Sequence, residues 1–259
     1  MSKFIDKLNQ VSQAVPQPVG FRPKQPVSSK PKILLVASLA RANVENLADY
    51  VAGADAGLLH ISELSSGAKT LKKISQVVPD IPWGGWLRAS GRGRTKQTVK
   101  AGCDFVVFSA DNTSLAIFQG EEVGKILEVE PSLGEGLLRA VDELPVDAVL
   151  IGSEQAKGHF LTWHHLMLFK HFAGLLTKPL LVSVPLSVTA GELQALWEAG
   201  VDGVVVQVGV GQPAERLKEL RQVIDKLVPP SPRKPEKPRP LLPYIARETR
   251  VVTEEEEEE

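Results

Sequence analysis

Residues 31–228 alternate eight times between a short apolar run and a segment with helical spacing, and this alternation constrains the fold more than any other feature. Runs such as KILLVASL, DFVVFSA and VDGVVVQVG are rich in Val, Ile, Leu and Phe and are bounded by Gly, Pro or Asp. Apolar runs of this length are typical of strands that are buried on both faces. Strands that alternate with helices pair in parallel through right-handed crossovers, so the sequence predicts an α/β fold built on a parallel sheet.

Eight strand–helix units within about 200 residues is the number that closes a (β/α)8 barrel. We therefore predict a single (β/α)8 TIM barrel over residues 31–228, with an open doubly wound sheet as the alternative. Residues 1–30 should form a short N-terminal extension, in which an amphipathic helix precedes a Pro-punctuated arm. Residues 229–259 are Pro-rich and end in six Glu residues, so we expect a disordered tail, because prolines remove backbone donors and like charges repel. A docking segment within that tail, LLPYIARETRVV, is the alternative.

Composition argues against several classes of protein. The chain of 259 residues has a net charge of −1 and lacks the basic field that nucleic-acid binding favours. No run reaches the roughly 18 apolar residues of a membrane span, and the N-terminus lacks the apolar core of a secretory signal. We therefore expect a cytoplasmic protein that binds neither nucleic acid nor membrane.

Cys103, the single cysteine, lies at the entry to an apolar run and is expected to be a buried structural thiol.

In barrels of this type the active site lies at the carboxyl ends of the strands, and this rule sorts the polar residues. Six residues at the starts of predicted strands should stabilise the opposite end of the barrel: Lys32, Lys125, Lys178, Asp104, Asp147 and Asp202. The predicted strand ends and the loops after them carry the candidates for chemistry and substrate contact: Ser38, His60, Arg88, Ser109, Asp111, Glu128, Glu130, Ser153, Glu154 and Gln207.

The fifth predicted strand, KILEVEPS, is the most informative of these. Side chains alternate along a strand, so Glu128 and Glu130 share one face while Leu127 and Val129 share the other. If the apolar pair faces the helices, the two carboxylates point into the barrel, where a buried charge needs a partner or a metal. Two nearby carboxylates split their pKa values, which suits acid–base catalysis. The alternative is a structural ion pair between Glu128 and Arg88.

His60 lies near the end of the second predicted strand, on the face that it shares with Leu58 and Ser62. An imidazole at that position is a candidate general base near neutral pH. A histidine that is simply hydrogen-bonded within the core is the alternative.

Two loops are candidates for anion binding. RASGRGRTK follows the third predicted strand and leads into a helix, and its Arg88, Arg92 and Arg94 carry guanidinium groups suited to bidentate phosphate contacts. The alternative for this segment is a solvated loop. After the eighth predicted strand, Gly209 and Gly211 leave backbone amides accessible in front of another helix.

The segment LWEAGVDGVVVQVGVG resembles the last helix, strand and loop of the aldolase-type, phosphate-binding TIM barrels. The resemblance covers roughly residues 178–211 and implies that Gly209 and Gly211 offer amides to a phosphate. Members of that group often end strand seven with a Gly-Gly-Ile type of turn, where this chain has SVPLS, and this departure argues against FMN as the cofactor. Schiff-base aldolases of the group use a Lys near the end of strand six, whereas the nearest one here, Lys157, lies out in the loop.

The sixth predicted helix, FLTWHHLMLFKHF, is apolar around much of its circumference. Its histidines do not have the spacing of a metal-binding pair, so we expect the helix to pack against the barrel and against a partner surface. It is the candidate interface of a homo-oligomer, and the residues that would test this are Trp163, Leu166, Met167 and Phe169.

Two functional hypotheses from different classes follow. In the first, the chain is an enzyme that acts on a small phosphorylated or anionic metabolite by lyase- or isomerase-type chemistry, with Glu128, Glu130 and His60 as acid–base groups. An FMN-dependent oxidoreductase is the alternative within this class. A divalent metal held by Glu128, Glu130, Asp111 and His60 is a further alternative. In the second hypothesis, the barrel lacks catalysis and serves as a binding or assembly module.

Overall fold

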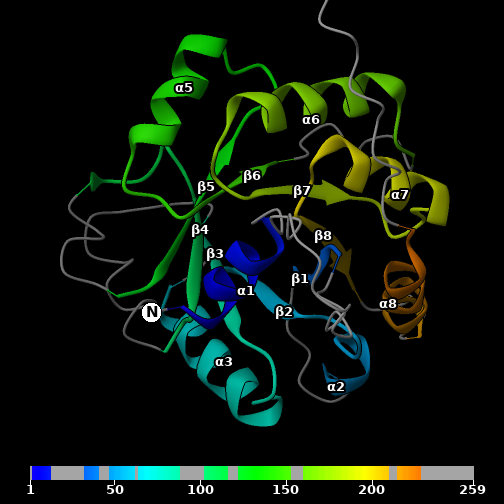
Figure 1. Cartoon of the computed structure of the whole chain (residues 1–259). Helices are drawn as coiled ribbons and strands as arrows, with labels where there is room; N and C mark the ends of the chain where they lie inside the picture. Colours follow the sequence, from blue (N-terminus) through cyan, green and yellow to red (C-terminus); the bar gives the residue numbers. More distant parts are fainter. Residues whose placement is uncertain are drawn as a thin grey trace, which may run out of the picture. The chain divides into compact units, whose positions relative to one another are not determined.

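The computed structural model describes residues 2–12, 32–40, 47–61, 64–87, 102–115, 122–152, 160–209 and 215–228. Eight parallel strands close into a barrel in chain order, because the first strand pairs with both the second and the eighth (Figure 1). The predicted (β/α)8 barrel is therefore confirmed, and the open sheet is excluded. The barrel and the N-terminal helix form one compact unit, Met1–Val228, and the predicted tail lies outside the described residues.

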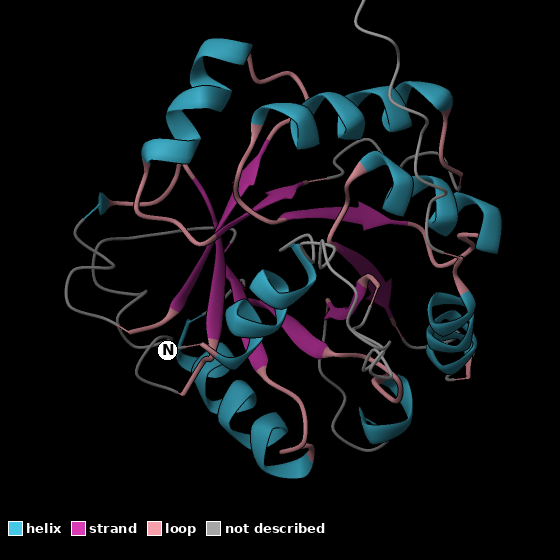
Figure 2. Ribbon diagram, in the orientation of Figure 1, coloured by secondary structure: helices cyan, strands magenta, loops and turns pink. Residues whose placement is uncertain are grey.

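The strands are β1 (Leu34–Leu39), β2 (Ala56–Ile61), β3 (Trp83–Leu87), β4 (Phe105–Ser109), β5 (Gly124–Val129), β6 (Ala148–Ile151), β7 (Leu180–Val184) and β8 (Gly203–Val208). The helices are α1 (Lys3–Ser12), α2 (Leu47–Tyr50), α3 (Leu64–Val77), α5 (Glu135–Glu143), α6 (Trp163–Leu175), α7 (Ala190–Ala199) and α8 (Arg216–Lys226). All of them except α1 lie outside the ring of strands (Figure 2). Among the residues described, no helix has both the length and the apolar character needed to cross a membrane.

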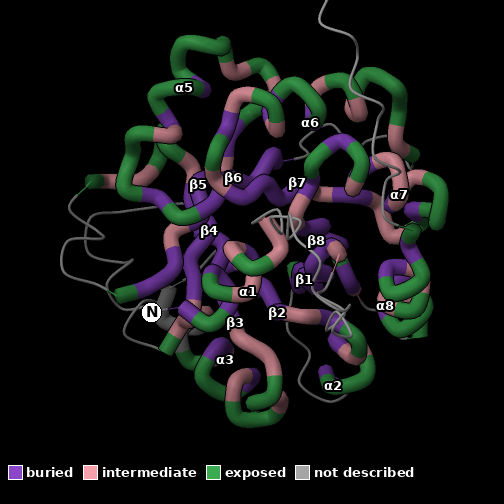
Figure 3. The backbone as a smooth tube through the Cα atoms, viewed as in Figure 1, coloured by how far each residue is buried: buried purple, intermediate pink, exposed green. Residues whose placement is uncertain are grey.

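Each strand has one face toward the barrel interior and the other toward the helices. On β5, Ile126 belongs to the interior core, whereas Leu127 and Val129 belong to the core between strands and helices. Both faces are buried, so the strands are apolar at nearly every position. Figure 3 shows the buried strands inside a layer of helices whose outer sides are exposed. The predicted orientation of Leu127 and Val129 is confirmed.

α1 closes the barrel at the amino ends of the strands and lies across its centre in Figure 1. The apolar face of α1 is buried within the interior core: Phe4, Ile5 and Leu8. The Phe4 ring lies 4.5 Å from the Phe105 ring, centroid to centroid. At Gly124 an added Cβ would lie 2.6 Å from Ile5, so the close approach of α1 requires a glycine there. The sequence predicts this helix but not its place in the barrel.

Carboxylates at the starts of strands accept hydrogen bonds from backbone amides. Asp147 accepts from the N–H of Lys125 at 2.7 Å, and Asp202 accepts from the N–H of Leu180 at 2.8 Å, in each case on the preceding strand. Asp104 instead accepts from the first two backbone N–H groups of α1, at 2.8 and 2.9 Å. The predicted structural role of these three aspartates is confirmed, and they hold the barrel at the end away from the candidate chemistry.

Two groups near the amino ends of the strands have strongly raised pKa values. Burial is the main reason that the pKa of the Cys103 thiol rises to about 12. The thiol is therefore protonated at neutral pH, which fits the structural role expected for it. Burial also raises the pKa of Asp202 to about 6, although the hydrogen bond from Leu180 acts in the opposite direction.

Candidate functional site

The interior of the barrel changes from apolar to polar near the carboxyl ends of the strands. The middle of the interior is filled by apolar side chains: Val36, Leu58, Val107, Ile126, Leu150 and Val205. One step further along their strands, the side chains on the interior face carry polar groups: Ser38, His60, Trp86, Ser109, Glu128, Ser183 and Gln207. A polar layer above an apolar layer forms the base of a site that faces the βα loops.

Glu128 on β5 is joined to Trp86 on β3. The indole Nε1–H of Trp86 donates a hydrogen bond to Glu128 Oε2 at 2.7 Å. Trp86 is only 4% exposed, so the indole is fixed in the barrel wall, while Glu128 is half-buried. The indole N–H is a donor only, so this carboxylate oxygen must be the acceptor. Glu128 thus occupies the interior position predicted for it, and the alternative of an ion pair with Arg88 is untested because Arg88 lies outside the described residues.

The second oxygen of Glu128 lies against the backbone at Gly152, directly after β6. A Cβ added at Gly152 would lie 2.5 Å from Glu128 Oε1, closer than any ordinary contact. The absence of a side chain at this position therefore provides the space for the carboxylate. Glu128 is confined between an indole on one side and a glycine on the other.

His60 on β2 contacts the same indole, that of Trp86. Its Nε2 lies 2.7 Å from the hydroxyl oxygen of Ser38 on β1, and its ring centroid lies 4.5 Å from that of Trp86 at an interplanar angle of 42°. Which partner donates in the pair of His60 and Ser38 depends on the imidazole tautomer. Four residues on four strands therefore form one connected chain, from Ser38 through His60 and Trp86 to Glu128.

This arrangement brings an imidazole and a carboxylate to the same indole at the mouth of the barrel. Imidazole can accept or donate a proton near neutral pH, and a carboxylate confined beside apolar surface is a suitable second acid–base group. Two neighbouring interior residues add hydroxyl and amide groups. Ser109 is half-buried and pairs in register with Glu128, and Gln207 is exposed and pairs in register with Ser38.

Glu130 is not brought into the interior with Glu128, contrary to the predicted pair of inward-pointing carboxylates. β5 ends at Val129, and Glu130 is exposed in the following turn, where its Oε2 accepts a hydrogen bond from Ser132 at 3.1 Å. Asp111 is likewise exposed in the turn after β4. In the described part of the chain, no three His, Cys, Asp or Glu side chains gather closely enough to hold a metal ion. The alternative of a metal held by both carboxylates, Asp111 and His60 therefore has no support in this geometry.

Of the two predicted anion-binding loops, one residue belongs to the part of the chain that the structure describes. Gly209 follows β8 and is half-buried. The remaining predicted contacts lie outside the described residues: Arg88, Arg92, Arg94, Ser153 and Gly211. Their participation in the site stays a prediction.

Trp86 is one of two residues of the site that sequence reasoning missed. The signal for it was the run WGGWL, in which Gly84 and Trp86 share a face by strand alternation. A Cβ added at Gly84 would lie 2.3 Å from the Phe105 ring, which shows that this face points into the crowded interior. Trp86 must therefore point into the barrel as well, one step closer to the mouth. Ser183 on β7 was missed in the same way.

Comparison with known proteins shows the fold alone. No protein-family model matches the chain, and a search of curated proteins finds no significant match. Among solved structures, a mutant tryptophan synthase alpha-subunit from the hyperthermophile Pyrococcus furiosus is 13% identical, with a TM-score of 0.58 over 76% of this chain and 97% of that one. A structure from Aquifex aeolicus VF5 is 11% identical, with a TM-score of 0.59 over 86% of this chain and 96% of that one. The chain is thus similar to TIM barrels.

Proposed function

We propose that the chain is an enzyme that binds a small phosphorylated or otherwise anionic metabolite at the carboxyl ends of the barrel strands. It would transform this metabolite by acid–base chemistry of the lyase or isomerase type. The observation that carries the proposal is the connected chain from Ser38 through His60 and Trp86 to Glu128 at the barrel mouth. Burying an imidazole and a carboxylate in one layer of the interior costs free energy, so a barrel interior with only a structural role would favour apolar side chains there.

In this proposal His60 and Glu128 are the proton-transfer groups. One of them removes a proton from the substrate, and the other returns a proton to the atom that gains electron density. Ser38 orients the imidazole through the contact at 2.7 Å, and Trp86 orients the carboxylate through its N–H. The anionic group of the substrate would bind the amides around Gly209 and Gly211 and the guanidinium groups of the third loop.

The resemblance of residues 178–211 to aldolase-type, phosphate-binding barrels supports the phosphate part of the proposal. The tryptophan synthase alpha-subunits that share the fold are, by their name, parts of an enzyme, and this agrees with a catalytic role for the barrel. The fold also places the active sites of such enzymes at the strand ends where the polar layer lies.

The test starts with a thermal-shift screen of inorganic phosphate, sugar phosphates, small carboxylic acids and FMN. A ligand that binds only the folded state raises the melting temperature by mass action. We expect an anionic metabolite to stabilise the full-length protein. His60→Gln and Glu128→Gln should weaken this response, while the control Glu143→Gln, at the exposed end of α5, should leave it unchanged.

A second measurement separates catalysis from binding. The responding metabolite is incubated with the protein in D₂O, and NMR follows the incorporation of deuterium at carbon. Proton abstraction predicts exchange with the wild-type protein and its loss with His60→Gln or Glu128→Gln. A ligand that binds without exchange would assign the barrel to the binding modules, and a response confined to FMN would point to redox chemistry. If no compound shifts the melting temperature, or if both variants respond as the wild type does, the proposal is wrong.

A further inference from the structure

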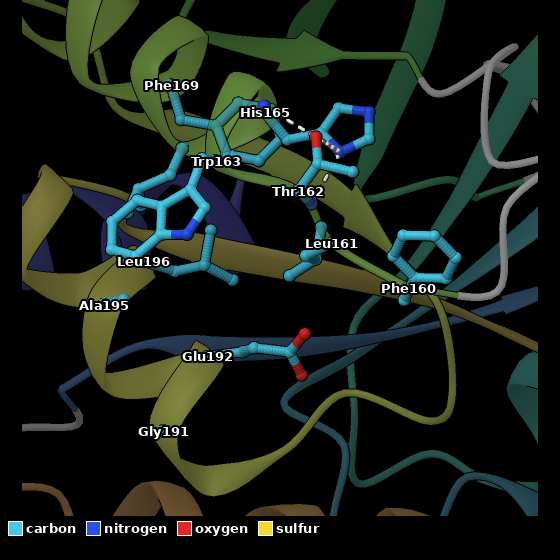
Figure 4. Close-up of a pocket in the computed structure, with 11 residues that line it drawn as sticks. Phe160, Leu161, Thr162, Trp163, His165, Phe169, Gly191, Glu192, Ala195 and Leu196 are labelled. Carbon is cyan, nitrogen blue, oxygen red and sulfur yellow. Dashed lines mark hydrogen bonds between the residues drawn. The ribbon is translucent and has the colours of Figure 1, made fainter.

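Several exposed apolar side chains lie on the outside of the barrel, over α6 and α7. Large apolar side chains at the start of α6 and just before it are far more exposed than is usual: Phe160 at 67%, Trp163 at 82% and Met167 at 68%. Beside them lies a cavity of about 540 Å³ between the two helices, with walls that include Leu161, Leu166, Ala195 and Leu196. In Figure 4, Trp163 and Phe160 lie on opposite sides of the set of residues that line the cavity. We call this surface the α6/α7 face.

Hydrogen bonds fix both walls of the cavity. Thr162 caps α6 by accepting from the N–H of His165, and its own N–H donates to the His165 ring at 3.1 Å. Thr189 and Glu192 form the same reciprocal cap at the start of α7, where Glu192 accepts from the N–H of Thr189 at 2.8 Å. Trp163 is the first residue of a capped helix, so its backbone is held in place. A preformed surface loses little conformational entropy on binding.

We propose that the α6/α7 face is the interface of a two-fold symmetric homodimer, in which Trp163 of each copy enters the cavity of the other. A two-fold interface requires that a protruding group and the hollow that receives it lie on the same surface of one chain. The α6/α7 face satisfies this requirement, since Trp163 lies at the edge of the cavity that an identical Trp163 would fill.

The exposed apolar area is of the size that a dimer needs. On a scale of 150–250 Å² for a whole aromatic side chain, the exposed fractions of Phe160, Trp163 and Met167 amount to roughly 450 Å² per copy. A standard interface buries about 800 Å² per partner, so these three side chains supply more than half of it before the cavity walls are included. An exposed apolar patch of a few hundred Å² is often a functional contact surface.

Charge also favours a second copy of this chain. α6 carries one Lys, Lys170, and no carboxylate. α7 has the opposite character, since Glu192 and Glu198 are its only charged residues. If the two-fold axis runs along the groove between the helices, α6 of one copy lies over α7 of the other. The Lys170 side chain of one copy then belongs to a helix that faces the acidic helix of the other, an arrangement that favours the correct pairing.

The experiment measures the mass of the full-length protein in solution by sedimentation velocity over roughly 1–100 µM, a range that includes the dissociation constants of weak dimers. We expect a species of twice the chain mass of 28.1 kDa. Trp163→Ala removes the protruding side chain, and Ala195→Phe fills the cavity. Each should weaken dimerisation at least ~30-fold, as expected for a central aromatic residue of an interface. Val77→Ala, on an exposed site of α3, is the control and should dimerise as the wild type does.

Mixing the two variants tests the geometry. Trp163→Ala retains an open cavity and Ala195→Phe retains the tryptophan, so a mixed dimer regains one of the two contacts that both pure variants lack. We expect dimers to reappear in the mixture, and circular dichroism of each variant should match the wild type. A wild-type protein that stays monomeric over the whole range overturns the proposal. So does a dimer that tolerates both variants, or an assembly that grows without limit, because a head-to-tail contact does not close.

Discussion

Replacing Trp86 by Phe removes its hydrogen bond to Glu128 while retaining an aromatic ring beside His60. The lost bond is the contact of 2.7 Å from the indole N–H to Glu128 Oε2. Hydrogen bonds to charged groups contribute about 1.5–3 kcal/mol, and Glu128 is half-buried and can recruit water, so we expect about 1.5 kcal/mol. Trp86 is nearly fully buried, and the smaller ring leaves a void that costs about 1 kcal/mol more. The variant should therefore lose about 2–3 kcal/mol in total.

A double-mutant cycle with Glu128→Leu separates the two contributions. In the Glu128→Leu background the hydrogen bond is already absent, so Trp86→Phe should cost only the void, about 1 kcal/mol. Urea unfolding of the four proteins at pH 7 then gives a coupling free energy of about 1.5 kcal/mol between the two positions. A coupling below about 0.3 kcal/mol would refute the reasoning. It would mean that the indole N–H does not hold the carboxylate in solution, and the site would lose its central link.

Three further predictions concern other parts of the barrel. Gly152→Ala should displace the Glu128 carboxylate and slow the proposed deuterium exchange ~10- to 100-fold, with little loss of stability. The control is Gly136→Ala, where an added Cβ meets nothing within 4 Å, and it should leave the exchange rate unchanged. Folding raises the pKa of Asp202 from 3.8 to about 6, so the protonated carboxyl stabilises the folded state below pH 4. This stabilisation is lost as the pH rises through 6. Relative to Asp202→Asn, the wild type should lose about 2–3 kcal/mol of unfolding free energy between pH 4 and 7, and parallel pH profiles would contradict this. Phe4→Ala should cost about 3–5 kcal/mol in urea unfolding, against less than about 0.5 for the exposed control Gln10→Ala, and a loss below about 1 would show that α1 does not fill the barrel.

The barrel could be predicted because its signal is repeated. Each strand is apolar on both faces, and the count of eight alternating units leaves few other topologies. The orientation of Glu128 followed from the same rule, since Leu127 and Val129 had to face the helices. The alternation of side chains along a strand can be read from the sequence of that strand alone, without knowing which strands pair with it.

Two of the features that were missed depend on contacts between distant residues, and one depends on where a strand ends. The amphipathic pattern of α1 shows that Phe4 needs an apolar surface, but not that the surface is the ring of Phe105 inside the barrel. Glu130 was assigned to the interior because the strand was assumed to continue, whereas β5 ends one residue earlier. The link from Trp86 to Glu128 joins side chains two strands apart, and a pattern within one strand does not contain it.

The place of α1 at the base of the barrel also has a consequence for biosynthesis. α1 is translated before every strand of the barrel, yet the surface that covers it is complete only when β8 pairs with β1. Roughly 190 residues separate α1 from β8, and at about 5–20 residues per second the ribosome needs on the order of 10–40 seconds to make them. Throughout that interval Phe4, Ile5 and Leu8 lack their final packing partners. The nascent chain thus carries a helix with an uncovered apolar face ahead of an unfinished barrel, and this helix can take its final place only after synthesis of the last strand.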